Sequence, residues 1–479
     1  MILLAALAHA ADVGGYIRVM TRPDLEGGDG RLGYWNLYGR LLNEGPYAAL
    51  ELRQSVLDPR PGTTEPWSNI HAKVEGGTVQ NADANGGSLY FFRLSQLYVQ
   101  AGNVGLANTT WRLGTLESNF GDLGLYDMRP AQVLFDTLGA QARYQVPSLE
   151  LTVGAGDAGF SLKGEEYNSV LTVGATARVN VANRLELGVG GQGYYEPAVV
   201  GNRYAPHDTP GVDYADYLRG DVLSAYLDAN PGQLADFPDP MSTSASSWKL
   251  VGYLGFGNLG PLRWNSLYAS YAQLHPDNFV SETVDGEPVS IYVTSLTDER
   301  TALLVGNEAQ LAVVPSRYDL VLGGLYGDQQ DADNDIAPSD YDRTFMSVVL
   351  RNQVYLSPTV HLLLEGSVAQ ELSHNGNAYR NHVDSLFENT GGNADSEGLE
   401  YGDADERFTW QAKGGVVLNP LGPGIYTRPS LRLLYGLQYS TQNNAFGNSF
   451  VESLAQYNDF GNVERHYHSV VALEAEAWF

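Results

Sequence analysis

Aromatic and arginine side chains occur together at several points of this chain, with a spacing that suits the binding of a polar ring. Tyr16 and Arg18 lie two positions apart, and so do Tyr426 and Arg428. Residues two apart share one face of an extended strand, so each pair offers a ring beside a cation. A sugar can pack its C–H face on such a ring while its hydroxyl groups bond to arginines and carboxylates. The further residues that the alternation places on this side are Arg40, Tyr47 and Trp478. The alternative is that these rings fill the protein wall or border a membrane.

Motifs for catalysis or metal binding are absent from the sequence. It has no G-x-S-x-G, Walker or H-E-x-x-H motif and no cysteine, and its nine histidines are scattered. Asp331, Asp333 and Asp335 lie at every second position, and oxygen-rich loops can hold Ca²⁺. The glycine and terminal glutamate of an EF-hand loop are missing there, which favours a solvated acidic loop. We therefore predict a protein that is not an enzyme, with no catalytic residues, no metal and no cofactor.

The charge balance excludes one class of partner. The chain has 56 acidic and 28 basic residues, which gives a formal charge of −28. Because phosphate binding needs clustered cations, we expect no nucleic-acid partner.

Apolar and polar residues alternate over much of the chain, which predicts β-strands. In VHLLLEGSVAQEL (360–372), for example, Val360, Leu362 and Leu364 oppose His361 and Glu365. The same alternation occurs in YWNLYGRLL (34–42), YAALELRQ (47–54) and YTRPSLRLLYGLQYS (426–440). Since a soluble sandwich would show this pattern too, the lengths of the connections must decide between architectures.

Short and long connections alternate along the chain. The short turns are 43–46, 102–108, 145–148, 181–184, 258–261, 314–317, 356–359 and 419–424, and the long polar segments include 54–87, 197–245, 328–341, 373–405 and 442–464. Transmembrane antiparallel β-barrels have this asymmetry, with short periplasmic turns and long extracellular loops. Eight short turns join sixteen strands, and a first and a last strand that close the barrel make eighteen. Two strand-like pieces, 67–75 and 287–295, are left out of this count as hairpins within loops.

The two ends of the chain support an exported barrel. Residues 1–10 are an apolar run that ends in Ala8-His9-Ala10, similar to a signal-peptide cleavage site, so we expect a leader remnant there and a single barrel domain over 11–479. The alternative is an apolar first strand. A last strand that ends on an aromatic residue resembles bacterial outer-membrane barrels. On that basis Phe479 would face lipid, Trp478 and Glu476 would face the interior, and the protein would lie in the bacterial outer membrane.

Several segments resemble the maltoporin-type sugar porins: DVGGYIRV, YGRLLNEGPYAALELRQ, YFFRLSQLYVQ, TTWRLGTLESNFGDLGLYDMRP, IYTRPSLRLLYGLQYS and ALEAEAWF. This resemblance implies a homotrimer of 18-stranded barrels that passes maltodextrins along a slide of aromatic residues beside a polar track. By matching position, the slide would contain Tyr16, Tyr47, Tyr426 and Trp478. The polar track and constriction would contain Arg18, Arg40, Arg93, Asp122, Asp127 and Arg129.

The sequence departs from this family in three places. Ala49 stands where the family has an acidic track residue, Arg129 where it has a constriction tyrosine, and Tyr426 where it usually has tryptophan. We therefore expect a passive channel for oligosaccharides without fixing maltodextrin as the solute. A general or cation-preferring porin is the alternative, and an outer-membrane enzyme or adhesion barrel is a more distant one.

Overall fold

The computed structural model describes most of the chain. The described residues are 12–23, 31–33, 36–58, 64–76, 92–159, 169–182, 184–197, 245–274, 279–284, 287–292, 300–331, 343–373, 406–441 and 466–479. The expected leader at 1–10, the aspartates at 333 and 335, and nearly all of the segments 197–245 and 373–405 lie outside them. No helix long and apolar enough to cross a membrane occurs among these residues.

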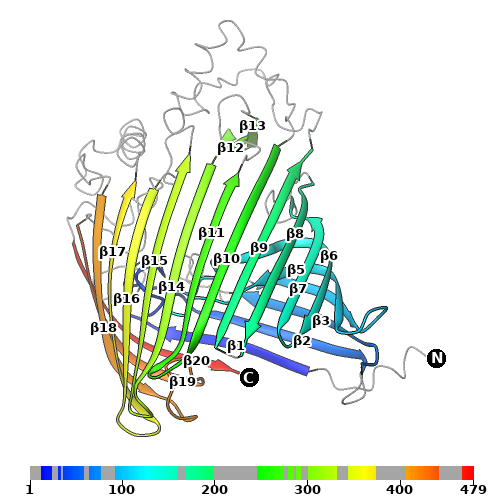
Figure 1. The fold of residues 1–479 in the computed structure, drawn as a ribbon. Coiled ribbons are helices and arrows are strands. Elements are labelled where there is room, and N and C mark those ends of the chain that lie inside the picture. Colours follow the sequence, from blue (N-terminus) through cyan, green and yellow to red (C-terminus); the bar gives the residue numbers. More distant parts are fainter. Residues whose placement is uncertain are drawn as a thin grey trace, which may run out of the picture.

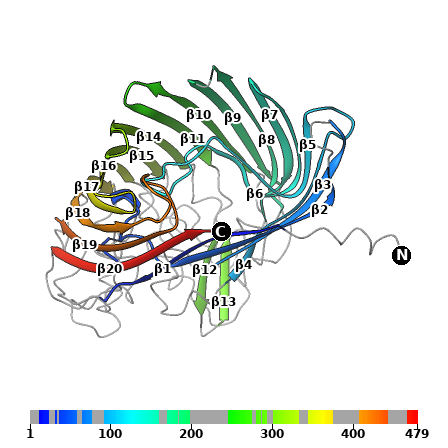
Figure 2. The same cartoon turned by 90° about the horizontal axis from the view of Figure 1, so that it is seen from below.

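Eighteen strands form one closed antiparallel sheet, as the sequence predicted (Figures 1 and 2). The wall strands are β1 (Asp12–Thr21), β2 (Tyr47–Leu57), β3 (Trp67–Gly76), β4 (Phe92–Gly102), β5 (Thr109–Asn119), β6 (Gln132–Val146), β7 (Leu149–Asp157), β8 (Leu171–Val181), β9 (Leu185–Glu196), β10 (Ala245–Leu259), β11 (Leu262–Leu274), β14 (Arg300–Val314), β15 (Tyr318–Asp331), β16 (Arg343–Tyr355), β17 (Val360–Ser373), β18 (Glu406–Leu418), β19 (Ser430–Ser440) and β20 (Tyr467–Trp478). Each strand pairs with its neighbour in sequence, and β1 pairs with β20 to close the barrel, with Tyr16 opposite Trp478. A closed sheet leaves no unpaired strand edge in lipid.

The wall is apolar outside and polar inside. On β17, Leu364 is 50% exposed and Val368 is 46% exposed, while Glu365 and Glu371 on the opposite face are only 3% and 1% exposed. The same reversal continues around the barrel, where leucines and valines form most of the exposed large side chains. An apolar outer band around a closed barrel is the surface that lipid requires. The protein is therefore an outer-membrane β-barrel.

Short turns and long connections lie at opposite ends of this barrel. Seven of the predicted short turns join neighbouring strands at one end, where the C-terminal residue also lies. The longer connections join strands at the other end, and the hairpin β12 (Phe279–Val284) and β13 (Glu287–Tyr292) belongs to one of them (Figure 1). The prediction of a loop hairpin near 287–295 is confirmed for its described part.

Two strand assignments from the sequence were wrong, and their errors cancelled in the count. Residues 34–42 are no wall strand, because 36–38 form the 3-10 helix η2 (Asn36–Tyr38), and 43–46 lead from this interior segment into β2. Conversely, 67–75 is not a loop hairpin but the wall strand β3. The physical reason is the same in both cases. Leu37 and Leu41 alternate like lipid-facing residues but are buried in the barrel interior, whereas the outward face of β3 has only Ile70 and Val74 as large apolar residues.

Two stretches of chain fold into the barrel. We call residues 36–46 the first inward segment and residues 120–131 the second inward segment. The backbone N–H of Arg40 donates to the carbonyl of Leu125 at 2.8 Å, which joins the two. Leu37, Tyr38, Leu123, Leu125 and Tyr126 are all fully buried in one apolar cluster with inward side chains of the wall. The barrel thus contains a hydrophobic core within its polar lining.

Inward-facing glycines make room for the second inward segment. A Cβ atom at Gly323 would lie 2.8 Å from the ring of Tyr126 and 2.9 Å from Leu125. At Gly174 it would lie 2.8 Å from Val133, which follows this segment in β6. The wall therefore has glycine, which lacks a side chain, at inward positions where the interior segment packs against it.

Candidate functional site

Three of the four predicted slide aromatics meet where the barrel closes. The rings of Tyr16 on β1 and Trp478 on β20 have centroids 4.4 Å apart, and Tyr16 lies 5.7 Å from Tyr47 at the start of β2. Strand pairing brings them together. Tyr16 is the cross-strand partner of Trp478, and Tyr47 is the cross-strand partner of Arg18, which lies two residues from Tyr16 on the same face of β1. We call these three residues the aromatic strip.

The members of the aromatic strip differ in accessibility. Trp478 is 64% exposed, whereas Tyr16 is only 8% exposed between its two neighbours, and Tyr47 is half-buried. A solute in the lumen can therefore contact Trp478 and Tyr47, while Tyr16 mainly holds them in place.

Glu476 connects the aromatic strip to four chain segments. Its carboxylate accepts hydrogen bonds from the Tyr16 hydroxyl at 2.5 Å and from Arg40 Nη2 at 3.0 Å. It also forms an ion pair with Arg428 Nε at 2.5 Å and a further one with Arg432. Multiple charged donors favour the ionised form of a buried carboxylate. Glu476 was expected to face the interior, but its role as a hub was not predicted, because its partners come from β1, the first inward segment, the β18–β19 connection and β19.

The predicted track residues Arg18, Arg40 and Asp127 form one charged group around Glu44. Arg40 Nε lies 3.2 Å from the Glu44 carboxylate, Arg18 also pairs with it, and Arg40 Nη1 lies 4.0 Å from Asp127. Burial raises the pKa of Glu44 to about 7, because loss of hydration outweighs the attraction of Arg40 and Arg18. The pKa of Asp127 is lowered: partial loss of hydration opposes this change, but the positive charge of Arg40 outweighs it.

Arg93 and Arg129 are placed on the accessible side of the lumen. Arg93 Nη2 lies 3.3 Å from Glu75, which also accepts a 2.6 Å hydrogen bond from the Tyr47 hydroxyl. Arg129 Nη1 lies 2.6 Å from Glu117. Both arginines are exposed, so they can meet a passing solute. Sequence analysis missed Glu44, Glu75 and Glu117, and the strand alternation could have identified only Glu75, which shares the inward face of β3.

Two predicted residues lie apart from this cluster. Tyr426 is not on the penultimate strand but in the connection before β19, where its hydroxyl donates to Glu308 at 2.8 Å and its ring packs on Gly124. Asp122 is exposed on the second inward segment, and only its backbone carbonyl makes a described contact, with the Tyr268 hydroxyl at 3.5 Å. Arg40 also lies on an inward segment rather than on the strand expected for it, because residues 34–42 leave the wall.

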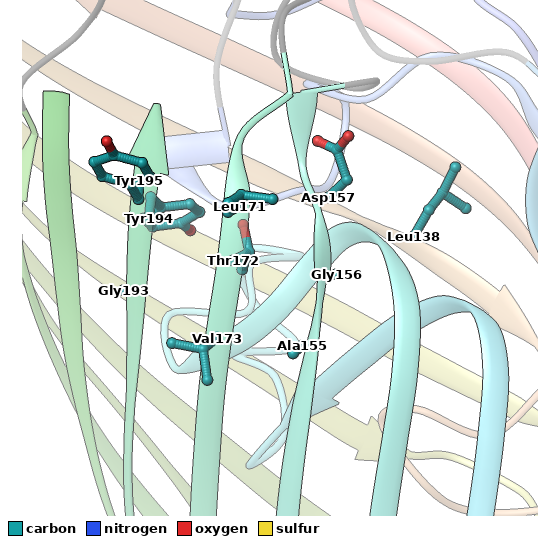
Figure 3. A pocket seen from close by; sticks show the side chains of 10 residues that line it. All are labelled: Leu138, Ala155, Gly156, Asp157, Leu171, Thr172, Val173, Gly193, Tyr194 and Tyr195. Atoms are coloured by element: carbon teal, nitrogen blue, oxygen red, sulfur yellow. The ribbon is translucent and has the colours of Figure 1, made fainter. Parts of the chain in front are cut away.

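A hollow of about 740 Å³ lies elsewhere, along the upper parts of β6 to β9 (Figure 3). It is lined largely by outward-facing apolar side chains, including the exposed Leu171, Val173 and Tyr195. Its position on the lipid-facing side separates it from the lumenal cluster. Among the described residues no group of three or more metal-ligating side chains gathers.

Comparison with known proteins gives similarity of shape at low sequence identity. No protein-family model and no curated sequence matches the chain. Three similar solved structures are OccAB1 of Acinetobacter baumannii (10% identity, TM-score 0.47, covering 98% of this chain and 96% of that one), the outer-membrane channel DcaP of the same organism (12%, 0.44, 98% and 97%) and OprB of Pseudomonas putida (12%, 0.41, 100% and 96%). Similarity at this level supports no conclusion about the solute. The fold assignment rests on the strand pairing of this chain itself.

Proposed function

We propose that this protein is an outer-membrane channel for passive diffusion of oligosaccharides. The observation that carries the proposal is the aromatic strip, whose accessible rings lie beside Arg93, Arg40 and Glu75. Rings that pack on sugar C–H faces and charged groups that bond to hydroxyls are the two elements a sugar site needs. Successive weak contacts of this kind let a solute enter and leave, whereas tight binding would stop conduction.

A planar bilayer experiment tests this function. The purified protein is inserted into the bilayer, and ion current is recorded while maltohexaose or another neutral oligosaccharide is titrated. Saturable interruption of discrete conductance steps is expected. A steady conductance that no neutral oligosaccharide affects would leave a pore but remove the sugar proposal, and absence of any conductance would direct attention to an enzyme or adhesion barrel.

A cation-preferring diffusion channel is a second candidate, favoured by charge. The chain carries a formal charge of −28, and both Asp122 and Asp127 are exposed on the second inward segment. A lumen that concentrates cations would conduct without a sugar-specific step. Absence of sugar block together with a cation-selective reversal potential would support this candidate.

We also propose a homotrimer, on the resemblance to sugar porins alone. Native mass spectrometry of the detergent-solubilised protein tests it directly, with a threefold mass expected and a monomer mass contradicting the proposal.

A further inference from the structure

A second cluster of lumenal side chains lies on β2 to β5, away from the aromatic strip. Strand pairing places Arg53, His71 and Tyr98 on one rung, since Arg53 pairs with His71 and His71 pairs with Tyr98. The rings of His71 and Tyr98 are stacked with centroids 4.6 Å apart and an interplanar angle of 13°. The guanidinium of Arg112 lies over the Tyr98 ring, 4.0 Å from its centroid.

Arg53 and Arg112 differ from the other lumenal arginines described above, because neither forms an ion pair with a carboxylate in the part of the chain that the structure describes. Arg112 is held by the Tyr98 ring and by the side-chain amide of Gln100. With this amide oriented so that its oxygen faces the guanidinium, the oxygen lies 2.9 Å from Nη2 and 3.0 Å from Nε. Arg53 is exposed, and no hydrogen bond or ion pair joins its side chain to another of the described residues. By contrast, Arg93 and Arg129 are neutralised by Glu75 and Glu117.

Most other charged groups described near this cluster are paired with one another. His71 is faced by Glu51, Arg112, Arg53 and Lys73. Lys73 is paired with Glu75 at 2.9 Å, which leaves two acidic groups beside Arg53: Glu51, and Asp12, its cross-strand partner on β1. Neither of them forms a described ion pair with Arg53. On the other side, Arg112 is faced by Glu117 and Arg143. Glu117 already pairs with Arg129, and Arg143 pairs with Glu150.

Unused hydrogen-bonding groups lie at the same place. Asn69 is only 2% exposed and is paired with Ser55 on one side and Gln100 on the other, yet neither atom of its side-chain amide has a hydrogen-bond partner among the described residues. The Nε2 atom of His71 is buried and also has no partner. Buried polar atoms of this kind are rare in folded proteins, and each one calls for an explanation.

We propose that Arg53, Arg112 and the His71–Tyr98 stack form an anion station that binds the carboxylates of an acidic oligosaccharide. The guanidinium of Arg112 lies over Tyr98 on β4, and Arg53 lies on β2. Because neighbouring strands are about 5 Å apart, the two positive charges lie about 10 Å apart along the wall. This separation suits a chain that carries carboxylates on successive units better than it suits a single small anion. Arginine is also the side chain best matched to carboxylate geometry. The proposal rests on the proposed function, since it names a solute class for the same lumen.

The test compares three solutes on the same bilayer-inserted protein: a hexameric oligogalacturonate, the neutral maltohexaose, and acetate as a free carboxylate. Oligogalacturonate is expected to interrupt the current at a concentration at least fivefold lower than maltohexaose does. Arg53→Gln is expected to remove this advantage and to leave the maltohexaose block unchanged. Because Arg53 has no described partner, this variant should fold normally. Arg263→Gln serves as the matched control, since Arg263 pairs with Asp319 at 3.0 Å at the short-turn end of β11.

The outcomes separate the two proposals. Equal block by the acidic and neutral hexamers, or an acidic block that Arg53→Gln does not change, overturns the anion station. Acetate and oligogalacturonate are also compared at equal concentrations of carboxylate groups. If acetate occupies the station as well as oligogalacturonate does, the station binds free carboxylates, and the proposal that it binds an acidic oligosaccharide is overturned. Block by oligogalacturonate without block by maltohexaose would support the station while removing the neutral sugar function. Arg112→Lys provides an independent check, because it keeps the charge but loses the planar guanidinium that lies over Tyr98. It should lower the acidic preference without abolishing it.

Discussion

Trp478 and Phe479 are consecutive residues with opposite surroundings. Trp478 contacts Tyr16 inside the barrel, whereas the backbone of Phe479 pairs with Gly15 at 3.0 and 3.1 Å. The alternation of side chains along β20 places Phe479 with Val471 and Leu473 on the outward face. At the scale of single residues, one position thus decides between lipid and solute.

We expect Trp478→Ala to weaken neutral oligosaccharide block by about 1–3 kcal/mol, by analogy with the stacking of bases on aromatic rings. The block constant in planar bilayers measures this change. Trp111→Ala is the control, because Trp111 faces outward and is 45% exposed there. If both variants are blocked as strongly as the unaltered protein, Trp478 does not contact the sugar.

Glu44 gives the protein a predicted dependence of stability on pH. Its pKa is about 7 in the folded barrel and near 4.5 when unfolded, so the folded state holds an extra proton between these values. The free energy of unfolding should therefore fall as the pH rises from 5 to 7, by up to about 1.4 kcal/mol per pH unit. Asp127, whose pKa is lowered, acts in the opposite sense and only at lower pH.

Denaturant unfolding in detergent at pH 5, 6 and 7 measures this slope. Glu44→Gln should flatten it, because glutamine cannot take up the proton. An equal slope in both proteins would show that another group binds the proton.

At the scale of elements, the second inward segment and the glycines of the wall depend on one another. Gly323 and Gly324 are adjacent on β15 but face opposite sides. A Cβ atom at Gly323 would meet Tyr126 at 2.8 Å, whereas nothing lies within 4 Å of one at Gly324. Space for the segment is therefore created by single glycines at inward positions.

Gly323→Ala is expected to displace the second inward segment and to destabilise the barrel by about 1–3 kcal/mol, the usual range for overpacking. Single-channel conductance should change with it, since the exposed Asp127 and Arg129 lie on the displaced segment. The measurements are single-channel current and denaturant midpoint, with Gly324→Ala as the matched control. Similar values for the two variants would show that the segment does not depend on this glycine.

The whole molecule separates its charge into two zones. Inside the described barrel many carboxylates are paired, as Glu365 is with Arg351 and Lys413 and as Glu371 is with Arg407. More than half of the 56 acidic residues but few of the 28 basic ones fall outside the described residues. The net charge of −28 therefore comes mainly from the connections rather than from the described wall.

This charge predicts a cation preference that weakens with salt. In a tenfold KCl gradient the reversal potential should have the sign of a cation-selective pore, most clearly near 0.1 M, where the screening length is about 10 Å. Near 1 M the length falls to about 3 Å and the preference should shrink. Anion selectivity at low salt would instead show that lumenal arginines such as Arg53 and Arg112 dominate.

Much of the architecture could be predicted from the sequence because a barrel wall has a simple local rule. Alternation places Leu364 outward and Glu365 inward whatever the rest of the chain does, and turn lengths then give the order of strands. The rule fails where apolar residues can be buried in a core inside the barrel instead of facing lipid. Leu37 and Leu41 obey the alternation of a lipid-facing strand, but they pack into a core inside the barrel.

For the candidate site, too, the orientation of wall residues could be predicted from the sequence, but the contacts made by interior segments could not. The sequence by itself determined that Tyr16, Arg18 and Trp478 face inward near the point of closure, because each follows from the parity of its own strand. Only the tertiary structure decided their partners. Glu476 meets Arg40 and Arg428 through segments that leave the wall, and Tyr426 contacts Glu308 rather than the strip. Such contacts depend on how interior segments cross the barrel, and that path is set by packing between distant residues rather than by any local pattern.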